Sequence, residues 1–167
     1  KGMPIGFFSF VRTGYHRFEI SSDEIFSVNA SLRSGIESFH TMLFASMRPD
    51  KRDSILWSFG YGVGSSVRLG KRWLMDFDLS AQQINKGSVG PKINLLNKLY
   101  VGAEYRISKG FYIAAGPVLN AQLTNTNYSH YPNIFDAIHP HVFYKDDLNK
   151  STHLDMWLGG KVALRFF

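Results

Sequence analysis

The chain has 167 residues, no cysteine, a formal net charge of +6, and 15% aromatic against 19% charged residues. This length corresponds to one domain, and without cysteine a disulfide framework, a thiolate nucleophile and a cysteine-based zinc site are excluded. No run approaches about 18 apolar residues, which excludes a transmembrane helix. The lysines and arginines are scattered, so the charge does not favour nucleic-acid binding; attraction to anionic lipid head groups explains it equally well.

Alternation of apolar and polar side chains predicts eight strands. In chain order they cover residues 4–21, 26–33, 38–47, 55–69, 73–82, 98–107, 111–124 and 154–167. The first is taken as one strand broken at Thr13-Gly14. Pro117, inside the seventh, is expected at a bulge or where the ladder bonding is interrupted. Residues 125–153 are expected to form one long irregular insertion.

The clearest alternation lies in residues 55–69. Its large apolar face is Ile55, Trp57, Phe59, Tyr61, Val63, Val67 and Leu69, and its small face is Ser58, Gly60, Gly62, Gly64 and Ser66. Glycine inside a strand is tolerated where another group packs closely against the backbone. A row of small residues that faces a narrow, filled lumen supplies this reason.

The connections between the predicted strands alternate in length. Counted back from the C-terminus, they are residues 125–153, 108–110, 85–95, 70–72, 48–54, 35–37 and 21–24. Short turns on one side and longer loops on the other are typical of outer-membrane barrels, and strands of ten or more residues match a bilayer. The sequence therefore predicts an all-β, antiparallel, up-and-down transmembrane β-barrel of about eight strands.

The last strand carries two contrasting faces and ends on two aromatic residues. One face is Leu158, Val162, Leu164 and Phe166, and the other is Lys161, Ala163 and Arg165. This strand resembles the closing strand of bacterial outer-membrane barrels. The resemblance implies that Phe166 and Phe167 form the signal read by the barrel-assembly machinery. In that family the final residue lies on the apolar face of the strand. Here Phe166 lies on the apolar face, and the final residue, Phe167, does not.

A wider resemblance covers most of the chain. Residues 57–64, 95–105 and 156–166 resemble the C-terminal barrel region of Bacteroidetes outer-membrane and surface-repeat proteins. The resemblance implies a single domain over residues 1–167 in the bacterial outer membrane, in contact with lipid and lipopolysaccharide, with no established activity and no catalytic residues to transfer. If residues 5–11 end a glycine-rich hairpin repeat such as precedes this region in some relatives, the chain is part of a larger barrel.

The polar faces of the predicted strands are expected to meet inside the barrel as an ion-paired, hydrogen-bonded plug, because unpaired charges in a narrow interior are costly. A conducting pore is the alternative. The expected lumen residues are Arg33, Arg68, Asp76, Asp78, Lys98, Glu104, Arg106, Gln122, Lys161 and Arg165.

Aromatic residues near the predicted strand ends are interpreted as girdles at the two membrane interfaces. A carbohydrate-stacking site is the alternative. These residues are Trp57, Trp73, Tyr100, Tyr105, Tyr112 and Trp157.

The insertion at 125–153 is expected to be an external loop that presents a surface to a partner. Its histidines and aspartates favour a metal site only weakly, because His139 and His141 flank a proline without helical spacing. No metal or other cofactor is therefore predicted. The insertion's residues of this kind are His130, His139, His141, His153, Asp136, Asp146 and Asp147, with Asp155 just beyond it.

The leading hypothesis is a non-enzymatic outer-membrane barrel with a structural or surface-interaction role. One alternative is a soluble calycin-like barrel that binds a lipophilic ligand, since period-two alternation does not say which face is inside. A second is a lipid-A-modifying enzyme, which needs serine, histidine and a carboxylate near the outer rim. Ser38 with His40 and Ser129 with His130 are available for it, but their spacing is not diagnostic.

Overall fold

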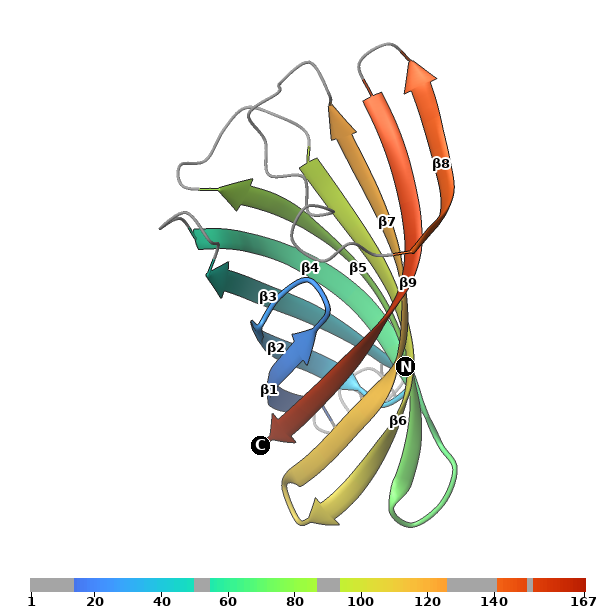
Figure 1. Ribbon diagram of the computed structural model, residues 1–167. Helices are drawn as coiled ribbons and strands as arrows, with labels where there is room; N and C mark the ends of the chain where they lie inside the picture. Colours follow the sequence, from blue (N-terminus) through green and yellow to red (C-terminus); the bar gives the residue numbers. More distant parts are fainter. Residues whose placement is uncertain (1–13, 50–54, 87–93, 126–140, 150–151) are drawn as a thin grey trace, which may run out of the picture.

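The computed structural model describes residues 14–49, 55–86, 94–125, 141–149 and 152–167. The described residues form nine β-strands (Figure 1). Their bounds are β1 Tyr15–Asp23, β2 Val28–Ile36, β3 Phe39–Pro49, β4 Ile55–Arg68, β5 Trp73–Lys86, β6 Asn94–Ser108, β7 Phe111–Asn125, β8 Val142–Asn149 and β9 Thr152–Phe166.

Eight of these strands make a closed antiparallel barrel. β1 to β7 pair in sequence order, β7 pairs with β9, and β9 pairs back with β1. β8 is a ninth strand that pairs with β9 alone among the described strands. The predicted all-β, up-and-down barrel of eight antiparallel strands is therefore confirmed. No helix in the described part of the chain is long and apolar enough to span a membrane.

The closing strand β9 has two successive partners along one edge. Its lower part pairs with β1 from Phe18↔Phe166 to Asp23↔Lys161. Its upper part pairs with β8 from Val142↔Trp157 to Asn149↔Thr152. The β8–β9 hairpin consequently extends beyond the end of β1, at the top of the view in Figure 1.

The strand ends are arranged as the connection lengths predict. The turns β2–β3, β4–β5 and β6–β7 span 37–38, 69–72 and 109–110, and they lie at the same end of the barrel as the C-terminus (Figure 1). The connections that include 50–54, 87–93 and 126–140 leave from the opposite end. We refer to these as the short-turn end and the long-loop end.

Two boundaries in the first hairpin differ from the prediction. The part of the first predicted strand at 4–13 lies outside the described residues, and β1 begins at Tyr15. Ser21 to Asp23, predicted as loop, continue β1 because they pair with β9. Phe26, predicted on the apolar outer face, is fully buried, because the chain turns inward before β2 begins at Val28.

The prediction that 125–153 is one irregular insertion is wrong for its described part. β8 occupies 142–149, and β9 begins at Thr152 rather than Leu154. Backbone pairing explains the difference, since β8 gives β9 a ladder partner where β1 has ended. Residues 126–140 lie outside the described chain.

Pro117 lies within a continuous β7. β6 and β7 pair at Tyr100↔Val118 and again at Ala103↔Ala115 in the same register, and the ladder between them is interrupted. Proline has no N–H to donate there. On its other side Pro117 lies opposite Gly160 of β9. The expected interruption of the ladder is confirmed.

The small face of β4 lies against neighbouring groups inside the barrel. A Cβ added at Gly60 would lie 2.2 Å from the carbonyl oxygen of Ala81, and one at Gly64 would lie 2.2 Å from an Asp78 carboxylate oxygen. These glycines are needed because β5 and its side chains approach the β4 backbone so closely.

We therefore expect Gly60→Ala to destabilise the barrel by about 1–3 kcal/mol, since the new methyl group meets backbone that cannot move aside. The matched control is Gly70→Ala in the β4–β5 turn, where an added Cβ has nothing within 4 Å. Thermal unfolding of both variants under the same solution conditions checks this. Equal melting temperatures for the two would contradict the close packing of β4 on β5.

Candidate functional site

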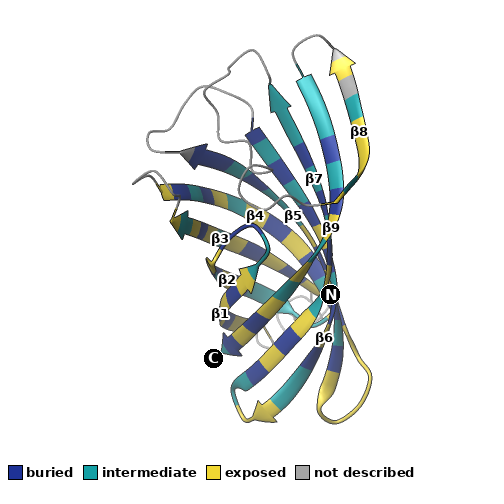
Figure 2. Ribbon diagram, viewed as in Figure 1, coloured by how far each residue is buried: buried dark blue, intermediate teal, exposed yellow. Residues whose placement is uncertain are grey.

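The two faces of the barrel wall have opposite chemistry. In β5, Asp76 and Asp78 are buried while Phe77 and Leu79 are exposed, because side chains alternate along a strand. Figure 2 shows the same alternation as bands along the strands. Further exposed apolar residues include Phe18, Leu32, Leu43, Phe59, Val63, Val67, Leu99, Ile113, Leu158, Val162 and Leu164. The barrel has a polar interior and an apolar exterior.

An ion-pair network fills the interior towards the short-turn end. Its centre is Arg165 of β9, whose guanidinium binds the carboxylates of Glu19 (2.7 Å), Asp76 and Glu104. All four side chains are at most 2% exposed. These residues come from β1, β5, β6 and β9, so the network joins strands around the barrel.

Three more cations complete the network. Arg33 of β2 binds Glu19 (3.0 Å) and Asp78, Arg17 binds Glu104 (2.9 Å), and Lys161 binds Glu19 (2.5 Å). Four cations therefore face four carboxylates: Arg17, Arg33, Lys161 and Arg165 against Glu19, Asp76, Asp78 and Glu104. This balance lets the charges remain buried, since an unpaired buried charge is costly.

His40 of β3 extends the network to a further strand. Its Nε2 lies 2.9 Å from Arg33 Nη1 and 3.0 Å from Asp78 Oδ1, and its side chain is fully buried. On the neighbouring strand Ser66 Oγ donates a 2.6 Å hydrogen bond to Asp76. Gly64 leaves the space that His40 and Asp78 occupy.

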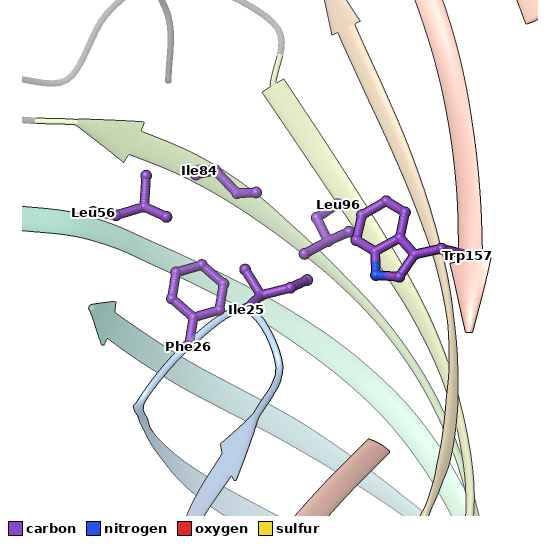
Figure 3. Packing of buried hydrophobic residues seen from close by; sticks show 6 residues of the cluster. All are labelled: Ile25, Phe26, Leu56, Ile84, Leu96 and Trp157. Atoms are coloured by element: carbon purple, nitrogen blue, oxygen red, sulfur yellow. The ribbon is translucent and has the colours of Figure 1, made fainter. Parts of the chain in front are cut away.

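The loop between β1 and β2 folds into the barrel and plugs the upper interior. Asp23 Oδ1 accepts hydrogen bonds from the backbone N–H groups of Ile25 (2.9 Å) and Phe26 (2.8 Å), which turns the chain inward. The two side chains then join a buried apolar cluster (Figure 3). The cluster comprises Ile25, Phe26, Leu56, Ile84, Leu96 and Trp157. We call residues 24–27 the plug loop.

Polar contacts hold the plug loop to the wall. The Glu24 carboxylate accepts hydrogen bonds from Asn120 Nδ2 (2.7 Å), Trp157 Nε1 (3.3 Å) and the backbone N–H of Gly160 (3.0 Å). Arg48 Nη1 donates to the backbone carbonyls of Glu24 and Ile25. At the base of the loop, Lys98 Nζ lies 2.5 Å from Asp23.

Aromatic rings close the interior at the short-turn end. The Arg17 guanidinium lies 4.3 Å from the ring centroid of Tyr15, 4.5 Å from that of Tyr112 and 4.9 Å from that of Phe167. Such cation–π contacts are stabilising within about 6 Å. Phe167 also donates its N–H to the Gly110 carbonyl (3.3 Å). Phe167, the final residue, thus covers the end of the lumen.

The structure brings together most of the expected lumen residues. Asp76, Asp78, Glu104, Arg33, Lys161 and Arg165 share the ion-pair network, Lys98 pairs with Asp23, and buried Gln122 donates to Asn94 (2.6 Å).

Two of the expected lumen residues lie elsewhere. Arg68 is more than half exposed and pairs with Glu37, because it lies at the end of β4 beyond the filled interior. Arg106 is half-buried at the same rim, where a register shift follows it. The prediction that Arg68 lies in the lumen is therefore wrong. The structure does not place Arg106 in the ion-pair network.

The girdle prediction is wrong for half of its residues. Tyr100, Tyr112 and Trp157 are buried because they alternate with the apolar outer residues and so point inward. Trp57, Trp73 and Tyr105 lie on the outer side. The Trp73 and Tyr105 rings are 4.7 Å apart at the short-turn rim. Arg72 donates a 3.2 Å hydrogen bond to the Tyr105 hydroxyl, which raises the pKa of the Arg72 guanidinium.

The catalytic and metal candidates remain scattered. Ser38 is exposed in the β2–β3 turn whereas His40 belongs to the buried network. His141 is exposed before β8, and His153 lies in β9. No group of three or more potential metal ligands occurs in the described ranges. His130, His139, Asp136 and Ser129 lie outside them.

The prediction from the sequence did not place Arg17, Glu19 or His40 in the lumen, and it did not include the plug loop. A signal for the first two existed, because Arg17 and Glu19 alternate with the apolar Phe18 and Ile20. His40 lies in the strand with the weakest alternation. The adjacent apolar pair Ile25-Phe26, which follows Asp23-Glu24, was the only local sign of an inward turn.

Replacing Arg165 by Met should destabilise the barrel by about 3–5 kcal/mol, because three carboxylates lose a buried partner. Arg68→Met is the control, since its pair with Glu37 is exposed and worth about 0–1 kcal/mol. Denaturant unfolding measures both. A loss at Arg165 no larger than at Arg68 would show that the network does not stabilise the fold.

Glu24→Ala should release the plug loop, because it removes the acceptor for three hydrogen bonds. We expect amide hydrogen exchange at residues 25 and 26 to become about tenfold faster or more. Glu37→Ala, in the β2–β3 turn at the other end, should leave that exchange unchanged. Equal protection in wild type and Glu24→Ala would mean that the loop is held without the Glu24 hydrogen bonds.

A comparison of the chain with models of protein families, with curated proteins and with solved structures found no match. Its function is therefore argued from the barrel and its interior.

Proposed function

We propose that the chain is an integral β-barrel of the bacterial outer membrane, with a plugged polar lumen and a structural or surface-interaction role that involves no catalysis. The observation that carries this proposal is the reversal of polarity across the wall: charged side chains are buried inside and large apolar side chains are exposed outside. Soluble monomers rarely expose contiguous apolar patches of more than a few hundred square ångströms.

A bilayer satisfies both faces at once. Closure through β1 and β9 gives every barrel strand a partner on each side, as backbone in hydrocarbon requires. β4 to β7 and β9 are 14 or 15 residues long, more than the roughly 9–11 residues that cross a bilayer at a tilt. In this proposal the short-turn end faces the periplasm and the long-loop end faces outward.

The interior argues against a soluble barrel that binds a lipophilic ligand. Such a barrel needs an apolar cavity large enough for its ligand. Here the described interior is occupied by the ion-pair network and the plug loop, and the cavity between them has a volume of only about 50 Å³. A filled lumen also supports a barrel that does not conduct.

The β8–β9 hairpin supports a role in surface interaction. It extends past the end of β1 and exposes Phe143, Tyr144 and Leu148 of β8. In our proposal this hairpin and its neighbouring loop meet an external partner, while Phe166 and Phe167 are read during insertion by the assembly machinery. The apolar outer face meets lipid and lipopolysaccharide.

The proposal is tested first by recovery and electrophoresis. We expect the protein only in the membrane fraction, and an unboiled detergent-extracted sample should migrate differently from a boiled one, because a closed barrel resists the detergent until heated. Recovery as a water-soluble monomer without a mobility shift would overturn the proposal.

Two exposed leucines offer a matched test of lipid contact. Leu158 lies near the middle of β9 and Leu69 lies just after β4 in the short-turn region, and they are 68% and 60% exposed. In vesicles, Leu158→Arg should cost about 2–4 kcal/mol and Leu69→Arg about 0–1 kcal/mol, because the penalty depends on depth. Equal effects in vesicles would contradict a lipid-facing exterior.

A further inference from the structure

Four positively charged residues gather at the short-turn end, around the neighbouring turns β4–β5 and β6–β7 (Figure 1). β5 and β6 are paired up to this rim, where the Arg106 N–H donates a 2.8 Å hydrogen bond to the Arg72 carbonyl oxygen. The two arginines therefore lie opposite each other on adjacent strands. Lys71 and Lys109 are exposed in the two turns. We call Lys71, Arg72, Arg106 and Lys109 the basic rim.

The basic rim has no acidic partner in the described part of the chain. No carboxylate there forms an ion pair with any of its four residues, and Glu37, which lies at the same end, pairs with Arg68 instead. Like charges directly opposite each other on paired strands are destabilising. Arg72 and Arg106 are placed in this way, so an anion that contacts both guanidinium groups would relieve their repulsion.

The outer face of β5 changes in chemistry from the rim towards the middle of the barrel. Arg72 comes first, Trp73 follows with 49% of its surface exposed, and the exposed Phe77 and Leu79 lie farther along. The hydrogen bond from Arg72 to the Tyr105 hydroxyl (3.2 Å) holds the guanidinium beside the Trp73–Tyr105 ring pair. Aromatic side chains of membrane barrels lie at the level of the lipid head groups, next to the apolar band. The basic rim is thus placed where lipid phosphates would be.

We propose that the basic rim binds the phosphate group of an anionic phospholipid in the leaflet at the short-turn end. This inference rests on the proposed membrane location. A guanidinium binds phosphate through two parallel hydrogen bonds, and the lysines add positive charge. An anionic head group is preferred to a zwitterionic one, because the latter brings its own positive charge close to four unpaired cations.

Native mass spectrometry of the detergent-solubilised protein tests the proposal, with phosphatidylglycerol or phosphatidylcholine of the same acyl chains as the added lipid. We expect phosphatidylglycerol to bind about fivefold more tightly or better, since each basic residue near an anionic surface adds about this factor. Equal affinities for the two lipids would overturn the proposal.

Charge-removing variants locate the binding site. Arg72→Gln and Arg106→Gln should each weaken phosphatidylglycerol binding about fivefold and leave phosphatidylcholine binding unchanged. Lys145→Gln is the matched control, because it removes one exposed positive charge from β8 at the long-loop end. An equal loss in Lys145→Gln would show that binding follows net charge alone, and the proposal would fail. Lys71→Gln combined with Lys109→Gln repeats the test in the exposed turns, without any change to a strand.

The mobility of unboiled and boiled samples separates this inference from the proposed function. Each variant should keep the wild-type mobility shift, which shows that its barrel is closed. A wild-type protein with the shift but without a preference for phosphatidylglycerol would keep the membrane barrel and refute lipid binding at the basic rim. A water-soluble protein without the shift would overturn both.

Discussion

The pairing of buried charges inside the barrel is the constraint on which the rest of the structure depends. Glu19 and Arg165 are 146 positions apart and Arg17 and Glu104 are 87 apart, yet both pairs meet in the lumen. A slip of one residue in any barrel strand would turn its inward side chains outward. Such a slip would leave carboxylates and guanidiniums unpaired in the interior or exposed on the apolar face. The network therefore ties strand register to barrel closure.

The interior is layered from end to end. Aromatic rings around Arg17 close the short-turn end, the ion-pair network follows, a small cavity lies beyond it, and the apolar plug loop closes the long-loop end. A polar middle between apolar ends reverses the arrangement of an ordinary soluble core. The plug loop completes the apolar packing at this end, since its fully buried Ile25 and Phe26 pack with Leu56, Ile84, Leu96 and Trp157 of the wall.

Period-two alternation was sufficient to predict the number of barrel strands and which residues of a strand share a face, because that property repeats along each strand. It does not say how far a residue lies from the rim. Arg68 alternates in step with the inward residues of its strand, and for this reason it was wrongly placed in the lumen. Tyr100, Tyr112 and Trp157 were assigned to the girdle because they lie near strand ends, although their alternation points them inward. The plug loop and β8 depend on contacts between distant segments, which alternation within one segment does not encode.

The unequal edges of β9 bear on how the barrel closes. β9 pairs with β7 along 15 residues but with β1 along only six, and Glu24 binds the Gly160 N–H just past the last of these pairs. A sheet open between β1 and β9 would thus retain nearly all of its ladder bonds, but it would lose the short seam, the plug and the ion pairs that Glu19 makes with Arg165 and Lys161. The seam between β1 and β9 has the fewest ladder pairs of any two neighbouring barrel strands, so a strand from elsewhere that entered there would have the fewest ladder bonds to replace. The Glu24 carboxylate, which binds the Gly160 N–H at the end of this seam, helps to hold β1 and β9 together.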